Sequence, residues 1–250
     1  MPTKRRADQI LVERGLADNR TRAQALILAG LAFAGERRIE KAGEPLAADV
    51  ALEVRGREHP WVSRGGVKLA HALDHFAIDP AGCVALDVGA STGGFTDVLA
   101  TRGARRVYAV DVGHGQLAWK LRQDPRVVVC ERVNARVVGR EHISEPVDIV
   151  TCDASFIGLA AILPAPLALT GERAALIALV KPQFEAGRTH VGKRGVVRDP
   201  AVHREVCARA EAWVADQPGW RVVGIVESPI LGPEGNREFL LYARRGPGAG

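Results

Sequence analysis

The stretch that most constrains this chain is a glycine-rich segment, Asp87 to Thr96, that lies between an apolar run and a helical pattern. Val84 to Leu86 are apolar and typical of a buried strand, and residues 95–102 predict a helix that ends at Gly103. A strand, a glycine-rich turn and a helix place backbone N–H groups around a polar ligand. The segment therefore predicts a ligand-binding loop in an α/β fold, with a plain tight turn as the alternative.

Three kinds of ligand loop compete for this pattern. A phosphate loop needs a lysine directly after its last glycine, but Phe95 follows Gly94. The dinucleotide fingerprint needs a glycine where this chain has Ser91. The remaining loop is that of S-adenosylmethionine (SAM) methyltransferases, in which an acid after the next strand holds the ribose hydroxyls. Here that next strand, residues 106–110, is followed by Asp111, so SAM is the favoured ligand.

Composition allows one large domain and one small one in 250 residues. The net charge of +5 permits a nucleic-acid partner. The four cysteines are far apart, which favours free thiols in a reducing cytosol. Neither a secretory signal nor an apolar run of roughly 18–20 residues is evident. We therefore expect a cytoplasmic protein with no membrane partner.

Residues 1–59 predict a small α+β domain. Helices are expected over residues 7–16 and 20–29, with Asn19 as the N-cap of the second, followed by a hairpin around residues 34–36 and a strand at 50–54. Two helices, a hairpin and arginines at the start of the second helix resemble the S4-type RNA-binding domain. The resemblance implies phosphate contacts that position RNA without reading its sequence; solvated surface charges are the alternative. The candidates are Lys4, Arg5, Arg6, Arg20, Arg22, Arg37, Arg38 and Lys41, with Arg64 beyond this domain.

Residues 60–63 are expected to form a linker, because Pro60 cannot lie inside a helix. A helix then continues to Phe76. It carries His71 and His75 at the spacing of a zinc pair, but no third ligand is evident, and we expect no metal site.

Residues 64–250 are expected to form the second domain, and from Val84 onward its strands and helices alternate. Strands are predicted at 84–88, 106–110, 126–130, 147–152, 173–180, 220–227 and 237–243, and helices at 94–102, 115–122, 158–169 and 200–215. Alternation of this kind predicts a parallel sheet with helices on both faces. The last two strands have no helix between them, which predicts an antiparallel pair at one edge. The expected fold is a Rossmann-like methyltransferase sheet, mostly parallel with one antiparallel edge strand, and its site lies at the carboxyl ends of the strands.

Lys181 directly follows the apolar strand 173–180. A lysine in such a position is costly unless it is used or paired. One interpretation is a structural salt bridge with Asp153 or Glu185. The other is that Lys181 removes the proton from a hydroxyl nucleophile.

Seven segments together are similar to the TlyA/haemolysin A family of ribosomal RNA ribose methyltransferases: residues 62–69, 87–96, 111–117, 131–136, 153–157, 181–185 and 235–239. The second half also resembles the FtsJ/RrmJ-type 2′-O-methyltransferases, which use a Lys-Asp-Lys-Glu tetrad. The resemblance implies the catalytic residues Lys68, Asp153, Lys181 and Glu238. It also implies a SAM site formed by Asp87, Gly89, Ala90, Ser91, Thr92, Gly93, Gly94, Phe95, Asp111, Asn134 and Asp153.

The mechanism that this resemblance implies is an in-line displacement. A ribose 2′-hydroxyl of ribosomal RNA, free or in a ribosomal subunit, attacks the methyl group of SAM, and Lys181 takes its proton. Lys68 and Glu238 orient the reacting groups, while Asp153 sets the electrostatics beside the methyl donor.

Three other functions compete with this interpretation. Asp153 to Phe156 faintly resemble the Asp-Pro-Pro-Tyr loop of base-N methyltransferases, whose aromatic residue stacks on a flipped base. A non-catalytic RNA-binding assembly factor that senses SAM would keep the same loop. A pore-forming haemolysin is disfavoured because the sequence predicts no membrane span.

Overall fold

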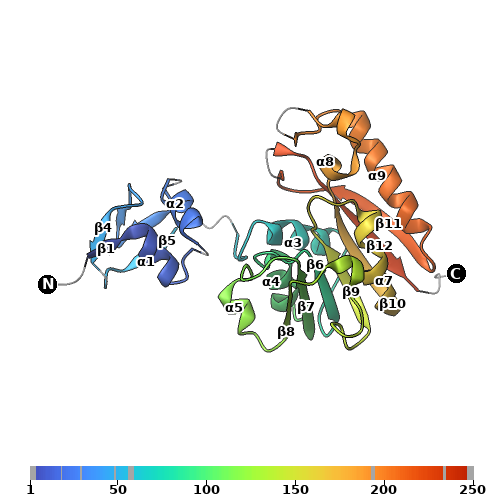
Figure 1. The fold of residues 1–250 in the computed structure, drawn as a ribbon, viewed down its shortest axis with the longest axis horizontal. Helices are drawn as coiled ribbons and strands as arrows, with labels where there is room; N and C mark the ends of the chain where they lie inside the picture. Colours follow the sequence, from blue (N-terminus) through green and yellow to red (C-terminus); the bar gives the residue numbers. More distant parts are fainter. Residues whose placement is uncertain are drawn as a thin grey trace. The chain divides into compact units, whose positions relative to one another are not determined.

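The computed structural model describes residues 4–17, 19–28, 30–47, 49–55, 59–192, 195–232 and 235–246. The chain forms two compact units, Met1–Pro60 and Trp61–Gly250 (Figure 1). Each has its own apolar core. No helix in these ranges is both long and apolar enough to span a membrane.

The first unit contains two short helices and two small sheets. Helices α1 (Ala7–Glu13) and α2 (Arg20–Leu28) pack Leu11 and Ile27 into its core. Strands β2 (Ala32–Ala34), β3 (Arg37–Arg38) and β5 (Leu52–Val54) form one antiparallel sheet, and β1 (Lys4–Arg6) pairs with β4 (Pro45–Ala47) in the other. The predicted helices and hairpin are confirmed, although α1 ends earlier than predicted, before Gly15 with its positive φ of 67°. Residue 29 of the second predicted helix lies outside the described residues.

The second unit is built on a seven-stranded sheet in the order β11-β12-β10-β9-β6-β7-β8. Its strands are β6 (Val84–Val88), β7 (Arg106–Asp111), β8 (Val127–Glu131), β9 (Val147–Cys152), β10 (Thr170–Val180), β11 (Trp220–Glu227) and β12 (Phe239–Arg245). Strand β12 pairs antiparallel with both β10 and β11, while β6 to β10 pair in parallel. The predicted sheet and its antiparallel pair at one edge are confirmed. The reversed strand itself lies one place in from the edge, because β12 inserts between β10 and β11.

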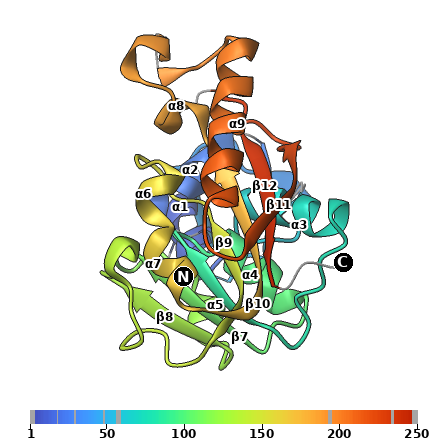
Figure 2. The ribbon, with the colours of Figure 1, turned by 90° about the vertical axis from the view of Figure 1, so that its right-hand side faces the viewer.

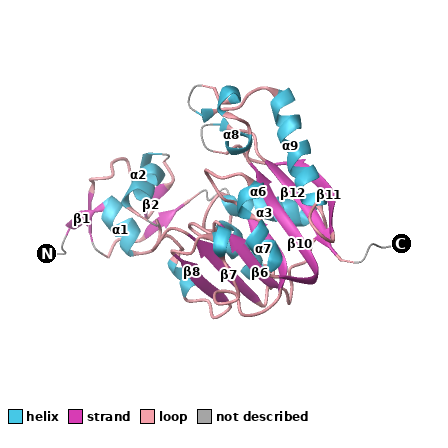
Figure 3. Cartoon of the chain, turned by 45° about the vertical axis from the view of Figure 1, so that its right-hand side comes forward, coloured by secondary structure: helices cyan, strands magenta, loops and turns pink. Residues whose placement is uncertain are grey.

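Helices cover both faces of this sheet (Figure 3). Helices α3 (Gly65–His75), α4 (Gly94–Thr101) and α5 (Trp119–Arg122) bury residues such as Leu69 and Leu99 on one face. On the other lie α6 (Leu159–Ile162), α7 (Pro164–Ala168), the 3₁₀ turn η1 (Ala135–Val137) and α9 (Pro200–Ala215), which runs along the sheet in Figure 2. Two short turns, α8 (Pro182–Glu185) and η2 (Arg188–His190), follow β10.

Four predicted elements of this unit differ from the structure. The helix expected at 115–122 is only α5, after Gly115 with its positive φ of 72°. The helix expected at 158–169 is two helices, because Pro164 has no N–H to continue the first. Strand β10 begins at Thr170, three residues earlier than predicted, and β12 is shifted to Phe239–Arg245.

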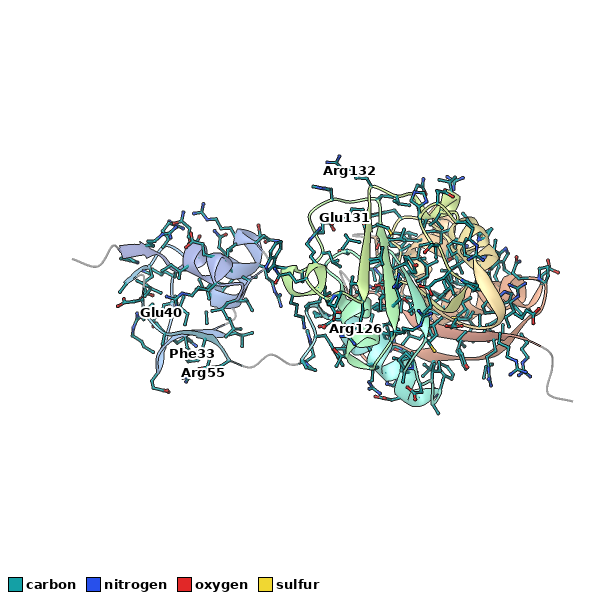
Figure 4. All side chains as sticks on the ribbon, turned by 90° about the horizontal axis from the view of Figure 1, so that it is seen from below. Phe33, Glu40, Arg55, Arg126, Glu131 and Arg132 are labelled. Atoms are coloured by element: carbon teal, nitrogen blue, oxygen red, sulfur yellow. The ribbon has the colours of Figure 1, made fainter. Side chains whose placement is uncertain are left out.

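The parallel strands bring their carboxyl ends to one edge of the sheet. Val88 lies opposite both Val110 and Cys152, and Ala178 lies opposite Cys152 on the other side. In Figure 4, Glu131 and Arg132 mark this edge at the end of β8, and Arg126 marks the opposite edge at its start. The residues that follow β6, β7, β9 and β10 therefore meet in one place.

Candidate active site

The glycine-rich loop between β6 and α4 lies against the loop after β9. Gly89 has φ +81°, and a Cβ there would lie 3.1 Å from the backbone N of Ala154. The N–H of Asp153 donates to the carbonyl of Val88 at 3.0 Å, which holds the two loops together. Glycine is needed at position 89 both for its conformation and for this close approach.

Asp111 joins this loop to the end of β7. Its Oδ2 accepts a hydrogen bond from the N–H of Ser91 at 2.8 Å, and its Oδ1 accepts one from the N–H of Gly113 at 2.7 Å. Ser91 is held in the left-handed region, with φ +47°. The predicted acid is therefore in contact with the predicted loop.

Two cavities adjoin at this edge and share Gly89, Ser91, Asp153 and Ser155. The first, of about 460 Å³, is lined by Ser63, Arg64, Gly65, Lys68, Gly89, Ala90, Ser91, Thr92, Gly94, Phe95, Asp153, Ser155, Lys181, Ile230, Leu231 and Gly232. The second, of about 490 Å³, is lined by Gly89, Ser91, Val110, Asp111, Val112, Gln116, Val133, Asn134, Ala135, Arg136, Asp153, Ala154, Ser155, Phe156, Ile157 and Ile162. The first is rich in charged groups, while the second combines apolar side chains with Asp111 and Asn134.

Nine of the eleven predicted cofactor residues line these cavities; Asp87 and Gly93 do not. Asp87 is fully buried and accepts hydrogen bonds from Thr96 Oγ1 at 2.7 Å and Thr151 Oγ1 at 3.0 Å. Burial raises the pKa of Asp87 to about 6. Its carboxyl group therefore supports the glycine-rich loop from the protein interior, by hydrogen bonds to α4 and β9.

Lys181 and Asp153 form an ion pair at the wall of the first cavity. Lys181 Nζ lies 2.6 Å from Asp153 Oδ1 and donates to the Asp153 carbonyl at 3.2 Å and to Ser155 Oγ at 3.1 Å. The pairing with Asp153 that sequence analysis offered as an alternative is present. Glu185 instead accepts from the N–H of Leu159 at 2.7 Å.

Lys68 and Glu238 form a second ion pair, deeper in the unit. Their Nζ and Oε2 atoms are 2.5 Å apart, with side-chain exposures of 9% and 0%. Gln183 Nε2 donates to the other oxygen of Glu238 at 3.3 Å. A Cβ at Gly232 would overlap this carboxylate, so the cavity wall passes directly over Glu238. The four predicted catalytic residues are therefore gathered as two ion pairs.

Phe156 lies in one of the seven segments that carry the family resemblance, but only the base-N interpretation gives its side chain a role. Its side chain is 89% exposed at the rim of the second cavity, and φ is +67°, a strained value for a bulky residue. Its ring lies 5.0 Å from that of Phe184. The sequence around a single aromatic residue predicts neither its exposure nor its backbone conformation.

The candidate RNA contacts of the first unit fall into two groups. Arg5 pairs with Glu13, Arg6 and Arg20 pair with the buried Asp8 at 3.0 and 2.8 Å, and Arg37 pairs with Glu44 at 2.5 Å. The Arg6 guanidinium holds the pKa of Asp8 well below its usual range. Arg22, Arg38 and Lys41 are exposed and make no ion pair with the described residues. The side chain of Lys4 lies outside the described part.

Three further residues named from the sequence, Arg64, His71 and His75, lie in the second unit. Arg64 lines the first cavity and donates to the carbonyl of Leu231 at 2.9 Å. The rings of His71 and His75 are 5.9 Å apart, and the described residues contain no group of three or more side chains that could hold a metal ion. Arg55, which was not predicted as a contact, lies over the Phe33 ring at 4.5 Å (Figure 4).

Comparison with known proteins gives consistent results. The family model described as FtsJ-like methyltransferase matches residues 61–245. The chain is 49% identical over 246 residues to the 16S/23S rRNA (cytidine-2′-O)-methyltransferase TlyA of Mycobacterium tuberculosis, covering 98% of this chain and 91% of that protein. It is 37% identical to Hemolysin A of Brachyspira hyodysenteriae, covering 95% and 98%. The solved structure of a candidate hemolysin from Streptococcus thermophilus has a TM-score of 0.77 at 40% identity, covering 98% and 90%.

Proposed function

The chain belongs to the family of FtsJ-like methyltransferases, and from this premise we propose that it methylates a ribose 2′-hydroxyl of ribosomal RNA. The observation that carries the proposal is the pair of lysine–carboxylate contacts, Lys181–Asp153 and Lys68–Glu238, beside the glycine-rich loop. Two lysines at one cavity suit a hydroxyl acceptor, since methylation of an exocyclic amine needs no such pair. The relative from Mycobacterium tuberculosis, which is named as a cytidine-2′-O-methyltransferase, supports a cytidine as acceptor.

SAM is the methyl donor of this enzyme, and it supplies an electrophilic methyl group when bound. The residues present fit it: the two adjoining cavities share the glycine-rich loop, and Phe95 stands where a phosphate loop would need lysine. Asp111 and Asn134 in the second cavity would hold the nucleoside, and the loop at Gly89 and Ser91 would hold the remainder. Gly93 and Asp87 would maintain the conformation of the loop without contacting SAM.

Lys181 is the proposed base. Its Nζ lies at the wall of the first cavity, and Asp153 and Ser155 fix its position. Lys181 would act as the base in its neutral amine form, after the ammonium group that pairs with Asp153 has released a proton to solvent. It would then take the hydroxyl proton, while the methyl group that SAM supplies would pass from sulfur to the ribose oxygen. Holding the hydroxyl and the donor in line supplies much of the acceleration.

Lys68 and Glu238 would position the acceptor. Lys68 lines the first cavity, while Glu238 lies beneath it and is held by Gln183. A fixed ammonium group at this place can donate to the acceptor oxygen and keep it aimed at the methyl group.

The first unit is proposed to be an S4-type RNA-binding domain, residues 1–59, joined through residues 60–63 to the methyltransferase domain, residues 64–250. Arg22, Arg38 and Lys41 are its best candidate phosphate contacts, because they are exposed and have no acidic partner among the described residues. Arg6 and Arg20 also hold the buried Asp8, so their substitution would disturb the unit itself.

The test is incubation of the protein with methyl-labelled SAM and unmethylated ribosomal subunits or free ribosomal RNA. Nuclease digestion and mass spectrometry then locate the label. Methyl on ribose supports the proposal, methyl on a base supports the base-N alternative, and RNA binding without transfer supports the assembly factor. Lys120→Met is a matched control for Lys181→Met, because Lys120 also pairs with an aspartate, Asp97 at 2.8 Å, but lines neither cavity.

A further inference from the structure

A third cavity, of about 590 Å³, lies at the opposite edge of the sheet from the two site cavities. Its lining includes residues at the start of β6 and β9, namely Cys83 and Asp148, and at the end of β12, namely Arg244 and Arg245. Arg244 lies opposite Ala175, six residues before Lys181 along β10. At about 3.3 Å a residue, the cavity is roughly 20 Å from the proposed base.

Three arginines form a row across neighbouring strands at this cavity. Arg221 of β11 lies directly opposite Arg244 of β12, and Arg244 lies opposite Ala175 of β10. Arg173, two residues before Ala175, lines the same cavity. All three line the cavity and are exposed. Adjacent strands are about 4.8 Å apart, and Arg173 lies two residues, about 6.6 Å, along β10 from Ala175, so the row spans roughly 12 Å at the backbone. A row of this length suits an extended polyanion better than a single small anion.

These arginines have no acidic partner in the parts of the chain that the structure describes. The two carboxylates of the lining make backbone contacts in place of an ion pair with these arginines: Asp148 Oδ2 accepts from the N–H of Val84 at 2.8 Å, and Asp79 Oδ1 accepts from the N–H of Ala81 at 2.9 Å. Like charges directly across a β pair destabilise a sheet. The Arg221–Arg244 pair therefore destabilises the folded sheet, and a bound anion would offset this destabilisation.

Tyr242 is the second, independent observation. Only 7% of it is exposed, it lines the cavity, and its hydroxyl has no hydrogen-bond partner among the described residues. It lies two residues before Arg244 on the same face of β12, with the Phe76 ring 5.0 Å from its own. Burial raises the pKa of Tyr242, against the opposing charge of Arg244 and Arg221, so its hydroxyl remains a hydrogen-bond donor. An unpartnered hydroxyl on a largely buried side chain and a row of cations on one wall form a site for phosphate oxygens.

We propose that this cavity binds the phosphate backbone of the substrate RNA, at a place remote from the nucleotide that is methylated. The inference rests on the proposed function, because it takes ribosomal RNA as the substrate. A structured RNA that presents one nucleotide to Lys181 extends well beyond 20 Å, so one molecule can occupy both places. The contacts are with phosphate, and they position the RNA without reading its bases.

The experiment is filter binding of in-vitro-transcribed 16S and 23S rRNA over a range of salt concentrations. Arg221→Gln and Arg244→Gln should each weaken binding several-fold. Each should make the negative slope of log affinity against log salt shallower by about 1, and the double variant should make it shallower by about 2. Arg204→Gln, which removes one charge from an exposed position of α9, is the matched control and should leave the slope unchanged. SAM affinity should stay at the wild-type value in every variant.

Thermal unfolding separates binding from structure, since relief of the Arg221–Arg244 repulsion should leave the melting temperature of either variant unchanged or raised. Slopes equal to that of Arg204→Gln would overturn this inference while the proposed function stands. Loss of calorimetric binding of inorganic phosphate in Arg244→Gln with unchanged RNA binding would overturn it in favour of a small anion. A wild-type protein that binds neither rRNA would overturn both proposals.

Discussion

The buried pair of Lys68 and Glu238 offers the sharpest test of how the site is built. Glu238→Gln keeps the shape of the side chain and its contact with Gln183 but removes the charge that compensates Lys68. With the lysine side chain only 9% exposed, the ammonium group is left largely buried and without a compensating charge. Breaking a buried pair in this way costs about 3–5 kcal/mol.

For a unit of this size, each kcal/mol lowers the melting temperature by about 2–4 °C. Glu238→Gln should therefore lower it by roughly 6–20 °C. In the double variant Lys68→Met/Glu238→Gln no charge remains uncompensated, and most of the loss should be regained. Glu205→Gln, which breaks the exposed pair with Arg209, is the control and should cost at most about 1 kcal/mol.

The assay combines calorimetric melting with turnover on rRNA. If Lys68 positions the acceptor hydroxyl, the double variant regains stability but not turnover. A Glu238→Gln protein that melts within about 2 °C of the wild type would refute the energetic reasoning. A double variant with wild-type turnover would refute the positioning role.

Three other predictions concern single residues. Lys181→Met should abolish turnover and leave SAM affinity at the wild-type level by calorimetry; residual turnover above a few per cent would remove Lys181 as the base. Because burial raises the pKa of Asp87 from 3.8 to about 6, the wild type loses stability as pH rises through that window. In urea unfolding, the free energy of unfolding of Asp87→Asn relative to that of the wild type should therefore increase by on the order of 3 kcal/mol between pH 4 and pH 7.5. The same relative free energy at both pH values would contradict this cause. Phe156→Ala should raise the KM for RNA several-fold without lowering the melting temperature, since the side chain is exposed and the backbone at this position is strained. An unchanged KM would show that the ring does not contact the acceptor.

The sequence predicted best where the signal is local. Asp111 was found because it directly follows an apolar strand, and Lys181 because a lysine in such a position needs a partner. The sheet was predicted from the alternation of strands and helices along the sequence, because apolar residues recur with a different period in each. The gathering of Lys68 and Glu238, 170 residues apart, came only from resemblance.

What the sequence could not supply depends on contacts between distant segments. The pairing of β1 with β4 has no local signal, because three-residue strands are too short for a pattern. Asp87 was expected to contact the cofactor, yet its carboxyl group braces the loop, since Thr96 and Thr151 approach it from two other elements. The row of Arg173, Arg221 and Arg244 depends on the order β10-β12-β11, which follows from the insertion of β12.

The central claim is that this protein methylates ribose in ribosomal RNA. A 2′-O-methyl group protects the adjacent phosphodiester bond from alkaline cleavage, because it blocks the attacking oxygen. The most direct measurement is a map of alkali-resistant positions in 16S and 23S rRNA from cells with the gene, without it, and with the Lys181→Met variant. The account predicts one or a few protected positions, cytidines among them, that disappear together in the last two strains. Identical maps in all three strains would contradict it.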